Sequence, residues 1–119
     1  GDDYPHRVAA TAHQLGARLN GIEWSLAFQS RVGPVKWTAP YLDDELKRLC
    51  ASPKPLVLMP LSFVADCLET IYDLDLVAVK AAREAGVSKV IRVRAFNDDP
   101  RFARILMDLA VEKNHVVLA

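Results

Sequence analysis

Residues 60–75 read Pro-Leu-Ser-Phe-Val-Ala-Asp-Cys-Leu-Glu-Thr-Ile-Tyr-Asp-Leu-Asp, and they follow directly on a short apolar run. That run, Pro55 to Met59, is bounded by prolines and is typical of a fully buried strand in an α/β sheet. A helix is predicted to follow from Asp66 to about Ala85, where Gly86 supplies a stop. We therefore expect a ligand site where the strand ends and the helix begins.

The helix carries carboxylates at a spacing that has two interpretations. Wound as an α-helix at about 100° per residue, it places Asp66, Glu69 and Asp73 within roughly 60° of one another, and Asp75 on the other side. Asp66 and Glu69 also fit an N-cap and an acidic capping box on a solvated helix face. Asp73 does not, because it lies two turns in and pairs with Glu69 at a cost of about 0.2–0.5 kcal/mol. A metal-binding or proton-handling role for the stripe is the alternative.

Composition limits the class of protein. The chain has 119 residues, enough for one domain over 1–119, and its 15 basic residues balance its 15 acidic ones, so no nucleic acid is expected as a partner. Cys50 and Cys67 are isolated, with no CxxC motif, which favours a reducing, cytoplasmic location without a zinc site or disulfide framework. We find neither an apolar run long enough to span a membrane nor a signal peptide.

The rest of the chain alternates helical and strand patterns. Hydrophobic periodicity, proline and glycine positions predict the following further elements: a helix over Pro5–Leu19, a strand over Ile22–Phe28, a loop over Ser30–Tyr41, a helix over Leu42–Ala51, a strand near Lys89–Phe96 and a helix from Pro100. Val116 to Leu118 is ambiguous. This order predicts an α/β fold, a three-layer Rossmann-like domain with a small, three-stranded parallel sheet and helices on both faces.

The loop over Ser30–Tyr41 is a second candidate site, since a loop of this length after a strand is often functional. Arg31 and Lys36 flank Trp37, which suits a flat anionic ligand that stacks on the indole and offers carboxylates to the cations. The alternative is that Trp37 only plugs the edge of the sheet. His6 and His13 are interpreted as surface residues.

Four segments resemble the ferrochelatase family, whose members insert ferrous iron into a porphyrin at the end of haem synthesis. The run from Ser62 to Asp75 closely resembles the acidic helix of that family. The other three segments are, in chain order, Gly1-Asp2-Asp3-Tyr4-Pro5, which resembles a Gly-Asp-Pro-Tyr segment, Phe28-Gln29-Ser30-Arg31-Val32-Gly33-Pro34 with Trp37 and Pro40, which resembles the signature loop, and Asn97-Asp98-Asp99-Pro100-Arg101-Phe102, which resembles the turn before the last helix.

The resemblance implies roles for individual residues. Glu69 matches the glutamate that the family uses in proton removal and metal handling, and Asp66 and Asp73 match carboxylates that continue the metal path. Trp37 and Arg31 are expected to contact the porphyrin. Cys67 stands where some relatives carry histidine, so a contribution of that side chain is not expected.

The resemblance also implies what surrounds the chain. Ferrochelatases consist of two Rossmann-like halves, and this chain matches the C-terminal half, so we interpret it as a fragment that is inactive alone. The expected partners are the porphyrin, ferrous iron as a substrate, and an N-terminal half that carries the catalytic histidine; peripheral contact of the full protein with a membrane stays open. The parent protein is then a metal chelatase, a lyase. We expect no permanently bound cofactor and no iron-sulfur cluster in this fragment.

Two rival hypotheses stay open. One is a non-catalytic module that binds a porphyrin or a metal ion. The other is a chelatase of a related class or a nucleotide-binding Rossmann domain; for nucleotides, no GxGxxG or Walker-type loop follows any predicted strand.

Overall fold

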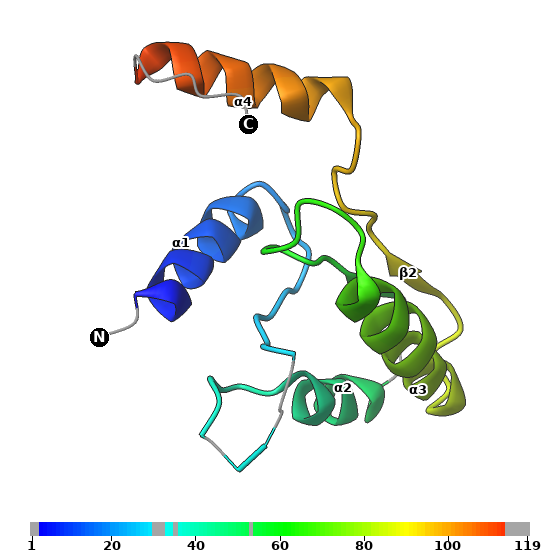
Figure 1. The fold of residues 1–119 in the computed structure, drawn as a ribbon. Helices are drawn as coiled ribbons and strands as arrows, with labels where there is room; N and C mark the ends of the chain where they lie inside the picture. The colour runs from blue at the N-terminus through cyan, green and yellow to red at the C-terminus, as the bar shows by residue number, and fades with distance from the viewer. Residues whose placement is uncertain (1–2, 30–32, 35, 53, 114–119) are drawn as a thin grey trace.

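The computed structural model describes residues 3–29, 33–34, 36–52 and 54–113. In chain order the elements are α1 (Tyr4–Gly16), α2 (Leu42–Cys50), β1 (Leu56–Leu58), η1 (Glu69–Ala78), α3 (Val79–Glu84), β2 (Val90–Arg92) and α4 (Pro100–Glu112), shown in Figure 1. Strands β1 and β2 pair in parallel, with Leu58 opposite Arg92. The predicted α/β class with a small parallel sheet is confirmed.

The predicted strand over Ile22–Phe28 is wrong. In the described residues the sheet has two strands, and Phe28 makes only an isolated parallel bridge with Tyr41. An alternating pattern forms a strand only where a neighbour pairs with its backbone, and here the ladder does not continue. Trp24 packs on α1 instead, edge-on to His13 with ring centroids 5.2 Å apart. A Cβ atom on Gly16 would overlap the Trp24 indole, so this contact requires glycine.

One face of the sheet is covered and the other is open. Leu58 packs in the core with Leu46 of α2, Leu74 and Ala78 of η1, and Val79 of α3. Because side chains alternate along a strand, the neighbouring Val57 and Ile91 point the other way, and they are 58% and 45% exposed. The predictions of a fully buried strand and of helices covering both faces are therefore wrong for the described residues.

The helix after β1 is wound differently from the prediction. At the end of η1 the backbone N–H of Val79 bonds to the carbonyl of Leu74, five residues back, which is the pattern of a π-helix. Ordinary α-helix follows in α3, and the segment ends at Gly86, whose φ of 93° confirms the predicted stop. The predicted α-helix from Asp66 is thus a π-helix from Glu69 followed by a short α-helix.

The predicted N-cap at Asp66 is also wrong. No side chain caps η1 from the position before it. Instead the hydroxyl of Thr70, a fully buried residue, accepts a 2.9 Å hydrogen bond from the backbone N–H of Cys67. This bond satisfies one of the N–H groups that a helix start leaves without a partner.

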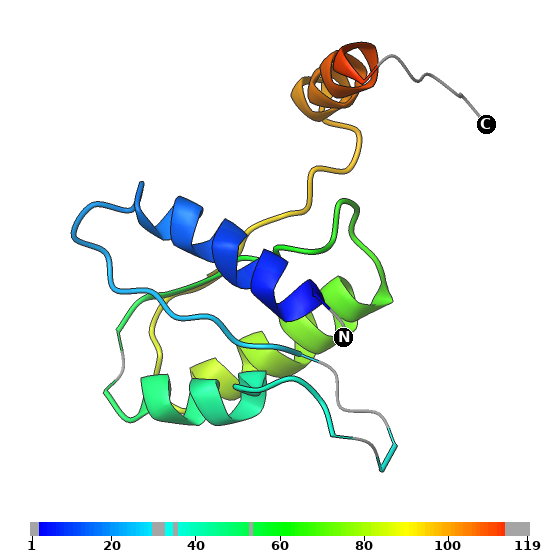
Figure 2. The same ribbon diagram turned by 90° about the vertical axis from the view of Figure 1, so that its left-hand side faces the viewer.

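The outer helices begin close to their predicted starts, but α1 ends at Gly16 and not at the predicted Leu19. Pro5 lies in the first turn of α1, and Asp99 caps α4 by accepting a 2.8 Å hydrogen bond from the N–H of Arg101. Figures 1 and 2 both show α4 standing away from the other elements, and apolar side chains on it such as Ile105 and Leu109 are about half exposed. Residues 116–118, where the prediction was ambiguous, lie outside the described part of the chain.

Candidate functional site

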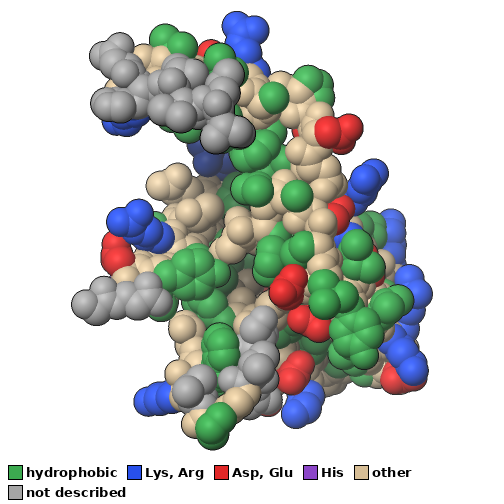
Figure 3. All heavy atoms as spheres, viewed as in Figure 1, with side chains coloured by type: hydrophobic (Ala, Val, Ile, Leu, Met, Phe, Trp, Pro, Cys, Tyr) green, Lys and Arg blue, Asp and Glu red, His purple; other side chains and the backbone are tan. Residues whose placement is uncertain are grey.

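A cleft of about 550 Å³ lies beside η1. It is of the size that small-molecule sites usually have. Its walls come from the segment before the loop, the start of α2 and the helix η1, and the lining side chains are Phe28, Gln29, Tyr41, Leu42, Asp43, Leu68, Glu69, Tyr72, Asp73, Val77 and Ala78. Figure 3 shows acidic side chains among hydrophobic ones on this face of the molecule.

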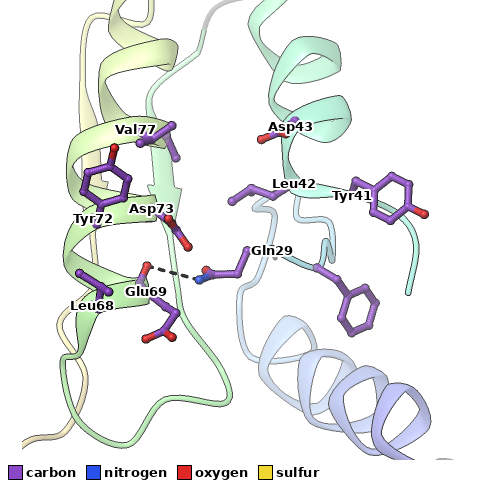
Figure 4. Close-up of a pocket in the computed structure, with 11 residues that line it drawn as sticks. Gln29, Tyr41, Leu42, Asp43, Leu68, Glu69, Tyr72, Asp73 and Val77 are labelled. Atoms are coloured by element: carbon purple, nitrogen blue, oxygen red, sulfur yellow. Dashed lines mark hydrogen bonds between the residues drawn. The ribbon is translucent and has the colours of Figure 1, made fainter. Parts of the chain in front are cut away.

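Residues four apart on η1 and just before it line the cleft. Hydrogen bonds from i to i+3 give about 3.0 residues per turn and bonds from i to i+4 about 3.6, so bonds to i+5 give roughly 4.4. Residues four apart then fall about 33° short of a full turn, whereas in an α-helix they lie about 40° past one, so either winding leaves them on one side of the helix. Glu69, Asp73 and Val77 form one such row on the cleft, and Leu68 and Tyr72 form another. In Figure 4 Glu69 and Asp73 project from the helix on the side of Gln29 and Leu42.

Glu69 is held as a carboxylate. A hydrogen bond with the Cys67 side chain, and a second from the backbone N–H of Glu69 itself, lower the pKa of the Glu69 carboxyl. The side-chain amide of Gln29 donates a 3.3 Å hydrogen bond to the Glu69 carbonyl and so ties the two walls of the cleft together.

The charge of the cleft favours a cation. Asp43, Glu69 and Asp73 contribute three carboxyl groups, and none of the described residues that line the cleft is Lys or Arg. Asp73 is half-buried, with less water to screen its charge than a fully exposed group has. The remaining lining is mainly apolar and aromatic. Such a surface suits a flat apolar ring on one side and a metal cation at the helix.

Asp66 lies outside this row, contrary to the predicted single stripe. Its carboxylate pairs with Arg92 and accepts a 2.9 Å hydrogen bond from the side-chain amide of Asn97. Together with the backbone N–H of Ala95, these donors lower the pKa of Asp66 to about 2. Asp75, predicted to point away from Asp66, binds the same guanidinium.

The three predicted metal ligands therefore fall in two places. In the part of the chain that the structure describes, no group of three or more His, Cys, Asp or Glu side chains is arranged to hold a metal ion. Glu69 and Asp73 share the cleft, whereas the carboxylate of Asp66 is occupied by Arg92 and Asn97.

The predicted porphyrin contacts are only partly visible. Trp37 is half-buried, and its carbonyl accepts a 3.3 Å hydrogen bond from the Tyr41 hydroxyl, but its side chain does not line the cleft. Arg31 lies outside the described residues, and Lys36 is exposed. Both interpretations of Trp37 stay predictions.

The sequence motifs did not predict the aromatic part of the cleft. Phe28, Tyr41 and Tyr72 line it, and Tyr72 is 54% exposed although it belongs to η1, which packs on the core. The position of Tyr72 between Glu69 and Asp73 in the sequence could have indicated that an aromatic side chain lies beside the carboxylates. Of the other candidates, His6 and His13 are exposed, as predicted, and both cysteines are free and half-buried.

Fold and site together define the class of this protein: it is an α/β domain in which an acidic π-helix lies beside a cleft lined by aromatic residues. Over residues 1–114 the chain matches the family model described as ferrochelatase, and it belongs to that family. It is 40% identical over 110 residues to the ferrochelatase of Geotalea daltonii, an alignment that covers 92% of this chain and 34% of that protein.

Relatives from distant organisms match equally well. The chain is 35% identical over 115 residues to the ferrochelatase of a Sulfurihydrogenibium species, covering 96% of this chain and 34% of that protein. It is 38% identical over 112 residues to the mitochondrial ferrochelatase of Gallus gallus, covering 92% of this chain and 28% of that protein. The chain thus spans about a third of the length of the curated relatives it matches. Across 3–29, 33–34, 36–52 and 54–113, no helix has the length and apolar character needed to cross a membrane.

Proposed function

We propose that this chain forms the C-terminal wall of the active-site cleft in a ferrochelatase that inserts ferrous iron into a porphyrin during haem synthesis. The observation that carries the proposal is the row of Glu69 and Asp73 along a π-helix that faces an apolar, aromatic cleft. Membership of the family supports the same reaction.

Metal insertion requires groups that accept protons and groups that ligate the metal ion. The porphyrin loses two pyrrole protons as the divalent ion enters the ring, so bases must take up two protons for each ion inserted. Glu69, with its lowered pKa, is ionised at neutral pH and can ligate the ion or accept a proton only transiently. Asp73, one turn along the row, offers the next oxygen ligands. Carboxylates suit a hard or borderline divalent ion, with little discrimination among metals.

The apolar surface of the cleft suits the ring. Phe28, Tyr41 and Tyr72 offer aromatic contacts, and Leu68 on the rim is 74% exposed in the isolated chain. A planar ring packed there would place its centre near the carboxylates. Because the described lining has no cationic side chain, we propose that the porphyrin propionates are met elsewhere, with Arg31 and Lys36 as the candidates, and that Trp37 contacts the ring.

The second wall and the histidine base are proposed to come from an N-terminal half of the same protein. We propose that the isolated chain is inactive, that no iron-sulfur cluster or permanently bound cofactor belongs to it, and that the protein acts in the cytoplasm.

The function is tested by Glu69→Gln in the full-length protein. The substitution keeps the shape of the side chain and removes its charge and basicity, so turnover should fall by about 10²-fold or more in an assay of metal insertion. Glu84→Gln is the matched control, because Glu84 lies on α3, pairs with Lys80 at 3.8 Å and is 68% exposed. Near-normal turnover of the Glu69→Gln protein would refute the assignment.

A further inference from the structure

Asn97 lies in the turn between β2 and α4, in a backbone conformation that few residues other than glycine adopt. Its φ of 52° falls in the left-handed region, which asparagine tolerates better than most residues. In this conformation the backbone N–H of Asn97 donates a 2.9 Å hydrogen bond to the carbonyl of Val64. The turn after β2 is thereby joined to the segment that leads into η1.

The side chain of Asn97 meets Asp66 at two points. Oδ1 of Asn97 accepts a 2.7 Å hydrogen bond from the backbone N–H of Asp66, and Nδ2 donates a 2.9 Å hydrogen bond to Oδ2 of the same residue. The amide nitrogen also donates to the carbonyl of Ala95, at 3.2 Å. Only 15% of the Asp66 side chain is exposed, so little water competes for these bonds.

Arg92 and Asn97 hold Asp66 in different ways. The guanidinium of Arg92 binds the carboxylate. Asn97 binds the carboxylate and the backbone, and its own backbone binds Val64, two residues earlier. Asn97 therefore fixes the path of the chain before η1 as well as the side chain of Asp66.

Leu68 and Glu69 follow Asp66 inside a short stretch that is held at both ends. The hydroxyl of the buried Thr70 accepts a 2.9 Å hydrogen bond from the N–H of Cys67 and lies 3.3 Å from Oδ1 of Asp66. Leu68 and Glu69 lie between these fixed points, and both line the cleft (Figure 4). The place of Glu69 thus follows that of Asp66, as expected of a site residue supported by hydrogen bonds behind it.

We propose that Asn97 is a positioning residue: by holding the backbone and the carboxylate of Asp66, it fixes the place of Glu69 on the wall of the cleft. Asn97 is not one of the described residues that line the cleft, so it acts through Asp66. The proposal deepens the proposed function, because its effect on turnover rests on the role of Glu69. Its structural part, the place of Glu69, does not depend on any activity.

The structural test is Asn97→Gly in the full-length protein. Glycine adopts the left-handed φ without strain and keeps the backbone N–H that binds Val64, so the substitution removes the amide and leaves the backbone bond. A crystal structure of the variant should show residues 66–69 displaced, with the Glu69 carboxylate about 1 Å or more from its place in a crystal structure of the wild type. A Glu69 that stays in place overturns the proposal, whether or not the protein inserts metal.

Turnover gives the second test. Asn97→Gly should lower kcat by about 10- to 10²-fold at a temperature where the variant stays folded, since a misplacement of about 1 Å can cost this much. In a Glu69→Gln background the same change should lower kcat by less than about twofold, because the group that Asn97 positions has already lost its function. Equal losses in both backgrounds, or a lower melting temperature with unchanged kcat, overturn the proposal. Near-normal turnover of Glu69→Gln alone refutes the proposed function instead, and the crystal structure of Asn97→Gly still decides the place of Glu69.

Two further variants complete the design. Asn20→Gly is the matched control, since Asn20 is exposed in the turn after α1, and it should leave kcat unchanged. If Asn97→Gly does not fold, Asn97→Asp keeps the shape and the acceptor for the N–H of Asp66 but sets an oxygen in place of Nδ2 against the Asp66 carboxylate. It should displace Glu69 in the same way, and an Asn97→Asp protein with Glu69 in place and full turnover overturns the proposal.

Discussion

Thr70→Val tests how the acidic helix begins. Thr70 is 0% exposed, and its hydroxyl accepts the 2.9 Å hydrogen bond from the N–H of Cys67 while lying 3.0 Å from the Cys67 carbonyl and 3.3 Å from Oδ1 of Asp66. Valine has nearly the same shape but no hydroxyl. The substitution leaves the Cys67 N–H without its partner, and an unsatisfied buried donor costs about 1–3 kcal/mol.

The expected effect is local and can be measured by hydrogen exchange. A loss of about 1–3 kcal/mol corresponds to roughly 5- to 150-fold faster exchange. Mass spectrometry of peptides that contain Cys67, from the full-length protein, should detect this change. Thr70→Ser is the control, because it removes a methyl group worth about 0.8 kcal/mol and keeps the hydroxyl acceptor. The reasoning is refuted if Thr70→Val exchanges like the wild type, or if Thr70→Ser exchanges as fast as Thr70→Val.

Two further predictions concern acid stability and packing. The pKa of Asp66 is lowered to about 2, so as pH falls below about 4 the unfolded chain takes up this proton first and stability is lost between about pH 4 and pH 2. Acid unfolding followed by circular dichroism should therefore show a steeper loss in this window for the wild type than for Asp66→Asn; parallel curves would contradict it. Gly16→Ala should displace the indole of Trp24 into water, although alanine favours helix by about 1 kcal/mol over glycine. The displacement is measured as a shift of the tryptophan emission maximum in a protein that lacks the other tryptophan, Trp37. An unchanged emission maximum would show that the contact is absent.

Local sequence signals predicted the starts of the outer helices and the end of α3, although α1 ends at Gly16 and not at Leu19. Proline in the first turn and the Asp99 cap define the starts of α1 and α4, and Gly86 ends α3, because each acts through its own backbone geometry. Tertiary pairing is not local. The alternating pattern over Ile22–Phe28 could not show whether a neighbouring strand would be present to complete its hydrogen bonds.

The site was predicted in its residues but not in its arrangement. The sequence identified Glu69 and Asp73, yet it grouped them with Asp66 because the helix was expected to begin at Asp66. The actual grouping places Asp66 with Asp75 on Arg92, because η1 begins at Glu69 and leaves Asp66 in the segment before it. Arg92 itself gave no signal, because a basic residue at the end of a strand is usually solvated.

Glu69 and Asp73 are proposed to bind a divalent cation together in the cleft. This binding is tested most directly by soaking crystals of the full-length protein with Co(II) and locating the ion by its anomalous scattering. We expect a peak within ligand distance of the Glu69 or Asp73 carboxylate, and we expect that peak to be lost in a Glu69→Gln, Asp73→Asn double variant. A peak at Asp66 instead, or one in the cleft that survives the double substitution, would contradict it.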